Sequence, residues 1–212
     1  MNINVIIPTY NRAKLLRKTL HSIGNSHMPK ELEIIVTVVN NNSTDETESV
    51  FDELKTQYPK IKFEYLFEAK QGRSAAVNAG ISHSKAELIS MLDDDIRITP
   101  EWFEVIEKVF GNRSDELDFI GGRVLPDWEI DPPSWVEPLK RGVISLRDYG
   151  DEEWFYSKET PMLSGGHAVF KASVFKEICL YPLELGTSGK SLISCEDDIF
   201  YDELIKEKKK GI

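Results

Sequence analysis

The chain has 212 residues, of which 41% are hydrophobic and 29% are charged, an ordinary composition for a globular protein. This composition excludes a fibrous repeat and a wholly disordered chain, and the length is sufficient to bury a core without disulfide or metal staples. The formal net charge of −10 makes nucleic acid and anionic lipid poor partners, although a divalent cation can bring a phosphate substrate to an acidic protein.

Signals for membrane insertion or secretion are not found in the sequence. No apolar run approaches the roughly 20 residues of a membrane span. The first residues, 1–4, lead directly into a predicted strand without the basic flank of a signal peptide. Cys179 and Cys195 have neither CxxC nor zinc spacing, and we expect them to be small buried hydrophobic residues in a reducing compartment. These features predict a cytoplasmic protein, with peripheral attachment to a membrane left open.

The first half of the chain alternates short apolar runs with segments of helical periodicity. Runs rich in β-branched residues predict strands, and apolar residues three or four apart predict helices. In chain order, we expect strands over 4–8, 33–39, 61–67 and 88–92, each followed by a helix, over 13–23, from 44 or 45 to 58, over 72–79 and over 101–110. This alternation predicts a mostly parallel sheet with helices on both faces, in which ligands bind beyond the carboxyl ends of the strands.

The second half of the chain is less regular. We expect strands over 119–125 and 163–170, the latter with a glycine bend, and helices over 171–178 and 196–210. Residues 127–156 form an irregular stretch rich in Pro, Trp and charge, and a loop this long in a compact domain is usually functional. Because the chain ends just past the last predicted helix, its C-terminus suggests a truncated protein.

Three consecutive aspartates, Asp93, Asp94 and Asp95, follow a predicted buried strand. In extended backbone Asp93 and Asp95 point the same way and Asp94 points to the opposite side. A pair of carboxylates spaced by two residues suits Mg²⁺ or Mn²⁺ that is shared with substrate phosphates. The alternative is a polar turn in which an aspartate caps the next helix.

A second acidic cluster, Glu196, Asp197 and Asp198, opens the last predicted helix. Acids favour the N-terminus of a helix through the dipole and through capping, which is one explanation of the cluster. The other is a general base held near a sugar hydroxyl.

Six motifs follow one another along the chain. They are VIIPTYNR (5–12), VVNNNSTDET (38–47), GRSAAVNAGI (72–81), ISMLDDDI (89–96), SGGHAVF (164–170) and EDDIF (196–200). Their succession resembles glycosyltransferase family 2, whose members are inverting enzymes with a GT-A fold. The resemblance implies an α/β protein with a Rossmann-like central sheet, forming a single GT-A domain over 1–212. The half over 1–115 would bind the nucleotide sugar, and a smaller mixed half over 116–212 would bind the acceptor.

The resemblance implies a donor site at the ends of the first strands. The turn over 8–12 corresponds to the family's wall for the base and ribose. Asn40 stands where the family usually has an Asp that reads uracil, and its amide also offers a donor and an acceptor. Asp45 has an alternative explanation as a helix cap, and Asn78 has one as a residue at the end of a helix before Gly80. The implied nucleotide-sugar-binding residues are Pro8, Thr9, Tyr10, Asn11, Arg12, Asn40, Asn42, Asp45, Arg73, Asn78, Asp93 and Asp94.

The resemblance also implies a metal site, a catalytic base and an acceptor side. Asp95, with Asp93, corresponds to the family's metal ligands for Mn²⁺ or Mg²⁺. Asp197, with Glu196, corresponds to its acidic motif, whose Asp is the catalytic base. The implied acceptor-side residues are Gly165, Gly166, His167 and Trp135. A structural role for the histidine and core packing for the tryptophan are the alternatives.

We therefore expect metal-dependent, inverting transfer of a sugar from a nucleotide-diphosphate sugar, with UDP-sugar favoured, to a saccharide or lipid-linked acceptor. The resemblance implies polysaccharide biosynthesis for the cell envelope, in the cytoplasm, with association at the inner face of the membrane left open. Two alternatives remain. One is a non-catalytic nucleotide-sugar-binding domain, and the other is a sugar nucleotidyltransferase, which would carry a glycine-rich GxGTR-like loop where this chain has PTYNR.

Overall fold

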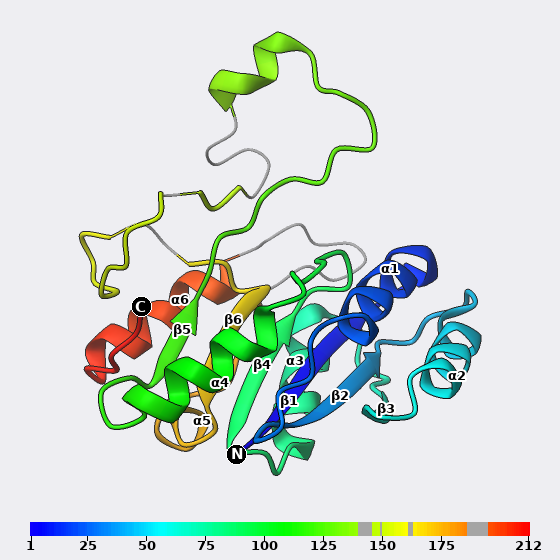
Figure 1. Ribbon diagram of the computed structural model, residues 1–212, viewed down its shortest axis with the longest axis horizontal. Coiled ribbons are helices and arrows are strands. Elements are labelled where there is room, and N and C mark those ends of the chain that lie inside the picture. The colour runs from blue at the N-terminus through cyan, green and yellow to red at the C-terminus, as the bar shows by residue number, and fades with distance from the viewer. Residues whose placement is uncertain (140–145, 149, 161–162, 186–194) are drawn as a thin grey trace.

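The computed structural model describes residues 1–139, 146–148, 150–160, 163–185 and 195–212 (Figure 1). At its centre is a six-stranded sheet in the order β3-β2-β1-β4-β6-β5. The strands are β1 (Asn2–Thr9), β2 (Glu33–Asn40), β3 (Lys62–Phe67), β4 (Leu88–Leu92), β5 (Phe119–Gly121) and β6 (His167–Lys171). The first four strands are parallel, and β6 runs antiparallel to both of its neighbours. The predicted mostly parallel sheet with a mixed second half is confirmed.

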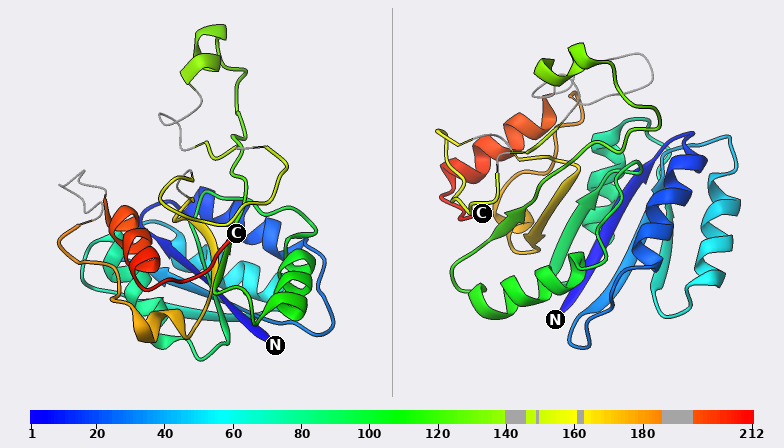
Figure 2. Two further views of the ribbon diagram at one scale, coloured as in Figure 1. Left: turned by 90° about the vertical axis from the view of Figure 1, so that its left-hand side faces the viewer. Right: turned by 45° about the horizontal axis from the view of Figure 1, so that its top comes forward.

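Helices cover both faces of the sheet, as predicted (Figure 2). They are α1 (Ala13–Gly24), α2 (Thr47–Gln57), α3 (Arg73–His83), α4 (Trp102–Arg113), α5 (Val174–Glu177) and α6 (Glu196–Lys206), with a 3₁₀ helix, η1 (Ser134–Leu139). Alternate residues of β1 point to opposite faces. Ile3, Val5 and Ile7 pack in a core with α1, α2 and α4, whereas Ile6 packs in a second core with α3, α5 and α6. None of the helices in the described ranges is long and apolar enough to cross a membrane.

The predicted end of the third helix at Gly80 is wrong. Helix α3 continues through this glycine to His83. A Cβ atom at Gly80 would overlap the Cγ2 of Ile6 in β1. The glycine is therefore explained by the close approach of α3 to the sheet, not by a helix stop.

The predicted elements of the second half are shifted or shortened. The strand expected over 119–125 ends at Gly121, where the chain leaves the sheet. Strand β6 begins only at His167 and extends to Lys171, which pairs with Leu88, so α5 begins later than predicted. These boundaries depend on which residues find a partner strand, and periodicity does not reveal this.

The last predicted helix is also too long. Helix α6 ends at Lys206, and Lys208 has a positive φ of 55°. Gly211 then forms a parallel bridge with Phe119, and the Ile212 carbonyl accepts a 2.7 Å hydrogen bond from the Gly121 amide. The final residues thus lie along the edge strand β5.

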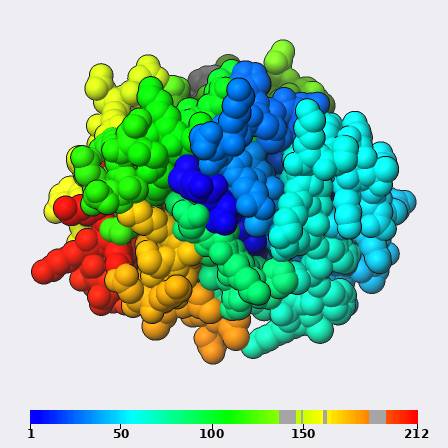
Figure 3. Space-filling view, turned by 60° about the horizontal axis from the view of Figure 1, so that its bottom comes forward, coloured from blue at the N-terminus to red at the C-terminus, as the bar shows by residue number. Residues whose placement is uncertain are grey.

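The two cysteines are exposed, which corrects the prediction that they are buried. The amino ends of the parallel strands form a closely packed face, with the first residues of the chain, in blue, near its centre (Figure 3). The carboxyl ends point toward the other end of the molecule, where the predicted site residues gather.

Candidate active site

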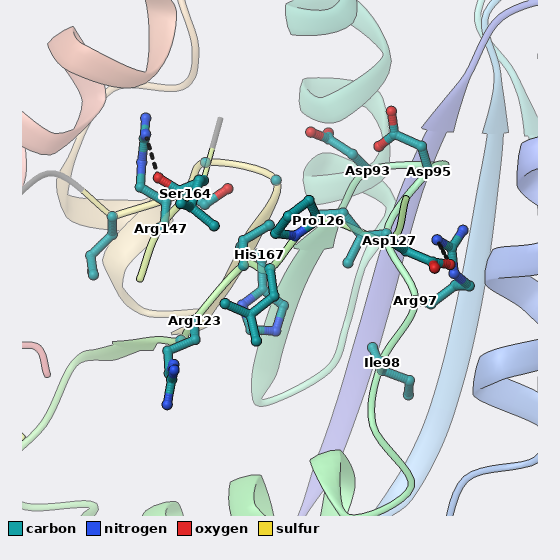
Figure 4. Close-up of a pocket in the computed structure, with 18 of the residues that line it drawn as sticks. Asp93, Asp95, Arg97, Ile98, Arg123, Pro126, Asp127, Arg147, Ser164 and His167 are labelled. Carbon is teal, nitrogen blue, oxygen red and sulfur yellow. Dashed lines mark hydrogen bonds and ion pairs between the residues drawn. The ribbon is translucent and has the colours of Figure 1, made fainter. Parts of the chain in front are cut away.

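A cleft of about 920 Å³ opens beyond the carboxyl end of β4 (Figure 4). Strand β1 lies between β2 and β4, so the strands that follow it in the chain are added first on one side of β1 and then on the other. The cleft lies where this direction changes. Ligands of open α/β sheets bind at such a switch point. Three predicted motifs contribute to the lining, through Asp93 and Asp95, through Gly165 and Gly166, and through Asp197.

The turn after β1 is joined to the turn after β2. Pro8 and Thr9 are the buried last residues of β1, whereas Tyr10 is 42% exposed. Asn11 has a positive φ of 52°, and its side-chain oxygen accepts a 2.7 Å hydrogen bond from the Thr44 amide. Asn42, with a φ of 68°, is exposed on the same surface. The structure thus places the predicted base-binding turns side by side.

Asp45 holds the starts of two helices. One carboxylate oxygen accepts a hydrogen bond from the Ala13 amide at 2.9 Å, and the other accepts one from the Thr47 amide at 3.1 Å. These bonds lower the pKa of Asp45, although burial opposes the shift. The contacts match the alternative explanation of Asp45 as a helix cap.

Asn40 and Asn41 are buried and bonded within the protein. The Asn40 side chain donates to the Tyr65 hydroxyl at 2.8 Å and accepts from the Ser43 amide at 2.8 Å. Base recognition by Asn40 therefore stays a prediction. Sequence reasoning missed Asn41, whose side-chain oxygen accepts from the Gly72 amide at 2.7 Å. This bond positions the start of α3, and its only signal in the sequence was the run of three asparagines.

Asp94 lies beneath the cleft rather than in it. It is 3% exposed and accepts hydrogen bonds from the Thr9 hydroxyl at 2.7 Å and from Arg12 at 2.8 Å. Burial raises the pKa of Asp94 to about 6, while these two partners oppose the shift. The predicted role of Asp94 in nucleotide binding finds no support in this geometry, because its carboxylate is used to join β4 to β1. Asp93 and Asp95 both face the cleft, which agrees with the predicted alternation.

Arg73, the first residue of α3, connects the two acidic clusters. Its guanidinium lies 3.1 Å from Asp93, 3.4 Å from Asp197 and 3.5 Å from Glu196. Burial raises the pKa of Asp197, and the charge of Arg73 only partly offsets this effect. One cation thus joins Asp93, one of the two predicted metal ligands, to the predicted base Asp197.

Gly165 and Gly166 make room for these carboxylates. A Cβ atom at Gly165 would overlap the Asp197 carboxylate, and one at Gly166 would overlap that of Asp93. The Gly166 carbonyl also accepts a 3.0 Å hydrogen bond from the Asp93 amide. The resemblance implies an acceptor-side position for the two glycines, and the structure shows that they allow close approach of the acids.

The predicted residues of the two turns do not line this cleft, and neither do Asn78 and Trp135. The Asn78 side chain makes two hydrogen bonds to the backbone of Tyr181, donating to its carbonyl at 2.7 Å and accepting from its amide at 3.0 Å. This contact gives Asn78 a structural role, and its part in nucleotide-sugar binding stays a prediction. Trp135 in η1 is 66% exposed on a segment that extends away from the sheet (Figures 1 and 2), and it is absent from the cleft lining.

His167 lines the cleft but is held by a residue that sequence reasoning missed. The indole of Trp102 donates a 2.8 Å hydrogen bond to Nε2 of His167, and Trp102 also lines the cleft. Burial lowers the pKa of His167 to about 4. The histidine is therefore a neutral acceptor that positions Trp102, which matches its structural alternative.

This shift predicts a pH-dependent stability. Because the folded pKa of His167 lies below the ordinary value of 6.5, its stabilising effect is present above pH 6.5 and is lost as the pH falls toward 4. Between pH 7 and pH 5 the parent should lose about 2 kcal/mol more unfolding free energy than His167→Gln, measured by urea denaturation. His27→Gln, at an exposed histidine, is the control and should follow the parent. Parallel pH profiles of His167→Gln and the parent would contradict the assignment.

The residues present fit a hard divalent cation shared with a substrate. Among the described residues, no three His, Cys, Asp or Glu side chains are grouped to hold a metal ion. Mg²⁺ and Mn²⁺, however, are commonly bound by one or two carboxylates together with substrate phosphates. The side chains of Asp93 and Asp95 are 35% and 41% exposed toward the cleft, and each is now paired with an arginine. They offer oxygen ligands that a metal-bound diphosphate can reach.

The cleft lies at the carboxyl ends of the strands of an α/β sheet, and residues 4–179 match the family model for glycosyl transferase family 2. The chain belongs to this family, and its fold is of the GT-A type. The glucosyl-dolichyl phosphate glucuronosyltransferase of Haloferax volcanii is 24% identical over 202 residues, which cover 93% of this chain and 61% of that protein. The GalNAc(5)-diNAcBac-PP-undecaprenol beta-1,3-glucosyltransferase of Campylobacter jejuni is 40% identical over 93 residues, which cover 44% and 29% of the two chains.

Solved structures show the same fold. The mannosyltransferase PcManGT of Pyrobaculum calidifontis, in complex with GDP-Man and Mn²⁺, superposes with a TM-score of 0.70 at 21% identity. The superposition covers 99% of this chain and 53% of that one. The chain thus spans little more than half of the structure that it resembles, and at most 61% of the two relatives named above.

Proposed function

We propose that the chain is the donor-binding and catalytic part of an inverting, metal-dependent glycosyltransferase. Residues 1–115 provide the donor side, and residues 116–212 provide the acceptor side. The observation that carries the proposal is the convergence of Asp93 and Asp197 on Arg73, beside the exposed Asp95. A departing diphosphate needs a cation and an attacking hydroxyl needs a base, and this cleft offers carboxylates for both.

In this proposal Asp95 and Asp93 would hold Mn²⁺ or Mg²⁺, which when bound would supply positive charge against the departing diphosphate. The Mn²⁺ in the PcManGT complex supports a divalent metal. Arg12 and Arg73, which pair with the two aspartates here, remain beside the diphosphate as further positive charges.

Asp197 accepts the proton of the acceptor hydroxyl. Its side chain is 27% exposed and lies in the cleft at the start of α6. A carboxylate with a raised pKa is a better base at neutral pH than an ordinary aspartate. The hydroxyl attacks the anomeric carbon from the face opposite the diphosphate, and nearby carboxylates favour the positive charge that develops on the sugar ring.

The donor is a nucleotide-diphosphate sugar, with UDP-sugar favoured. Tyr10 offers an exposed ring beside the joined turns after β1 and β2, where a base can stack. Solved neighbours carry GDP-Man or UDP-GlcNAc, which supports the donor class. The names of two relatives contain dolichyl phosphate and PP-undecaprenol, which supports a lipid-linked acceptor. In this proposal, transfer to such an acceptor, or to a saccharide, takes place at the inner face of a membrane, within cell-envelope polysaccharide synthesis.

A product assay separates this proposal from its alternatives. The protein is incubated with radiolabelled UDP-sugars, Mn²⁺ and a panel of glycan acceptors, and the products are analysed. Release of UDP with transfer of label supports the proposal. Binding of UDP-sugar without turnover on any acceptor favours a non-catalytic domain. In a separate incubation with UTP and sugar 1-phosphate, formation of UDP-sugar favours a nucleotidyltransferase.

The metal ligands are tested by Asp95→Ala. We expect Mn²⁺ to strengthen UDP binding to the parent but not to the variant, because the variant lacks the most exposed oxygen ligand of the pair. Calorimetric titration of UDP with and without Mn²⁺ measures the effect. Asp127→Ala is the matched control, since Asp127 also lines the cleft but pairs with Arg97. An unchanged Mn²⁺ effect in Asp95→Ala would remove Asp95 from the metal site.

A further inference from the structure

One arginine of the cleft has no acidic partner. Among the seven arginines in the described ranges, six form ion pairs with Asp or Glu, namely Arg12, Arg17, Arg73, Arg97, Arg113 and Arg123. Arg147 is the exception. The segments outside the described ranges contain no Asp or Glu at all, so the sequence offers no further side-chain carboxylate to it. In a chain with a net charge of −10, an unpaired arginine in a cleft calls for an explanation.

Arg147 is held in place by its backbone. Its amide donates to the Val124 carbonyl at 3.0 Å, and its carbonyl accepts from the Val124 amide at 3.0 Å. To the described residues the guanidinium makes one long bond, 3.3 Å, from Nη1 to the carbonyl of Leu146. Its Nε is buried and has no hydrogen-bond partner among the described residues. A buried N–H without an acceptor is costly, and a ligand oxyanion would remove this cost.

Arg147 lies on the same side of the cleft as Asp197, the proposed base. It lines the cleft and also an adjoining cavity of about 170 Å³. Figure 4 shows Arg147 beside Ser164, with Asp93 and Asp95 across the pocket. Ser164 precedes the glycine that contacts Asp197 and accepts a 3.4 Å hydrogen bond from the hydroxyl of Tyr201, one turn after Asp197 on α6.

We propose that Arg147 binds an anionic group, a phosphate or a carboxylate, that is carried by the acceptor. This inference rests on the proposed glycosyl transfer and specifies the acceptor class. The planar guanidinium matches both oxyanions, and its Nε–H and Nη–H can donate to two of their oxygens. Because Asp93, Asp95 and Asp197 make the rest of the cleft acidic, an anionic acceptor needs this local cation.

The test uses protein saturated with UDP and Mg²⁺, so that the donor site is occupied. Glucose 1-phosphate, glucuronic acid and the neutral methyl glucoside are titrated separately by calorimetry. At least one of the two anions should bind the parent about tenfold or more tightly than methyl glucoside, the ratio that one charge-assisted hydrogen bond supplies. If glucose 1-phosphate binds more tightly, the acceptor carries a phosphate, and if glucuronic acid binds more tightly, it carries a carboxylate.

Arg147→Gln should lose this preference. Arg123→Gln should keep it, because Arg123 lines the same two cavities but pairs with Asp148 and Asp151. Equal anion affinity in the parent and Arg147→Gln, or no preference of the parent for either anion, would overturn the inference. UDP affinity is measured first and should be equal in all three proteins. Failure of UDP to bind counts against the proposed function instead, and the anion titration is then made on the free protein.

Discussion

Asp197→Asn is expected to lower the rate of sugar transfer by about 10²–10⁴-fold while UDP affinity stays close to that of the parent. Asparagine keeps the shape of the side chain and an oxygen that can accept from Arg73, which lies 3.4 Å from Asp197. It cannot take a proton from the acceptor hydroxyl. The measurement is the initial transfer rate at saturating donor and metal, with UDP affinity and unfolding free energy measured in parallel.

Asp198→Asn is the matched control. Asp198 is the next residue of α6, but it is exposed and points about 100° away from Asp197 around the helix. Its replacement should leave the transfer rate nearly unchanged. If all of α6's first-turn acids only complement the helix dipole, both variants should behave alike and retain activity. That result would contradict a base at Asp197 and would favour the non-catalytic alternative.

Arg73→Met is expected to lower the free energy of unfolding at pH 7 by about 3–5 kcal/mol, the usual cost of removing one partner of a buried ion pair. The side chain of Arg73 is 17% exposed, and its loss leaves Asp93, Glu196 and Asp197 close together without a cation. Methionine fills a similar volume, so the effect reports the charge. The measurement is urea denaturation without ligand.

The pH dependence of this loss provides a second check. Without Arg73 the clustered carboxylates hold protons more tightly when folded, so the destabilisation should shrink between pH 7 and pH 5. Arg17→Met is the control, because Arg17 forms an exposed surface pair with Glu53 and should cost little. A similarly small loss in Arg73→Met would show that Arg73 does not hold the two acidic clusters together.

The order of the elements up to α4 follows from local sequence. Strands such as Glu33–Asn40 are apolar runs of β-branched residues, and helices such as Ala13–Gly24 show apolar residues at helical spacing. Both signals depend only on neighbours within a few residues. The turn chemistry after each strand was equally visible, which placed three of the predicted motifs at one edge of the sheet.

The second half shows where local signals fail. Strand β6 is inserted between β4 and β5, and its residue Val169 pairs with Ser90 and Ile120. These partners are distant in sequence, so neither the limits of β6 nor the early end of β5 could be predicted from periodicity. Gly80 and Asn78 show the same limit of local signals, because their contacts are to Ile6 and to Tyr181 in distant parts of the sequence.

The sequence by itself determined the family, the parallel arrangement and the alternation by which Asp93 and Asp95 face the cleft while Asp94 does not. Only the tertiary structure decided that Arg73 joins Asp93 to Asp197, although Asp197 lies 124 positions after Arg73 in the chain. It also decided that Gly165 and Gly166 accommodate those acids and that Arg147 stays unpaired among the described residues. The physical reason is that facing direction follows from backbone geometry within one strand, whereas an ion pair between elements depends on how the folded chain brings them together.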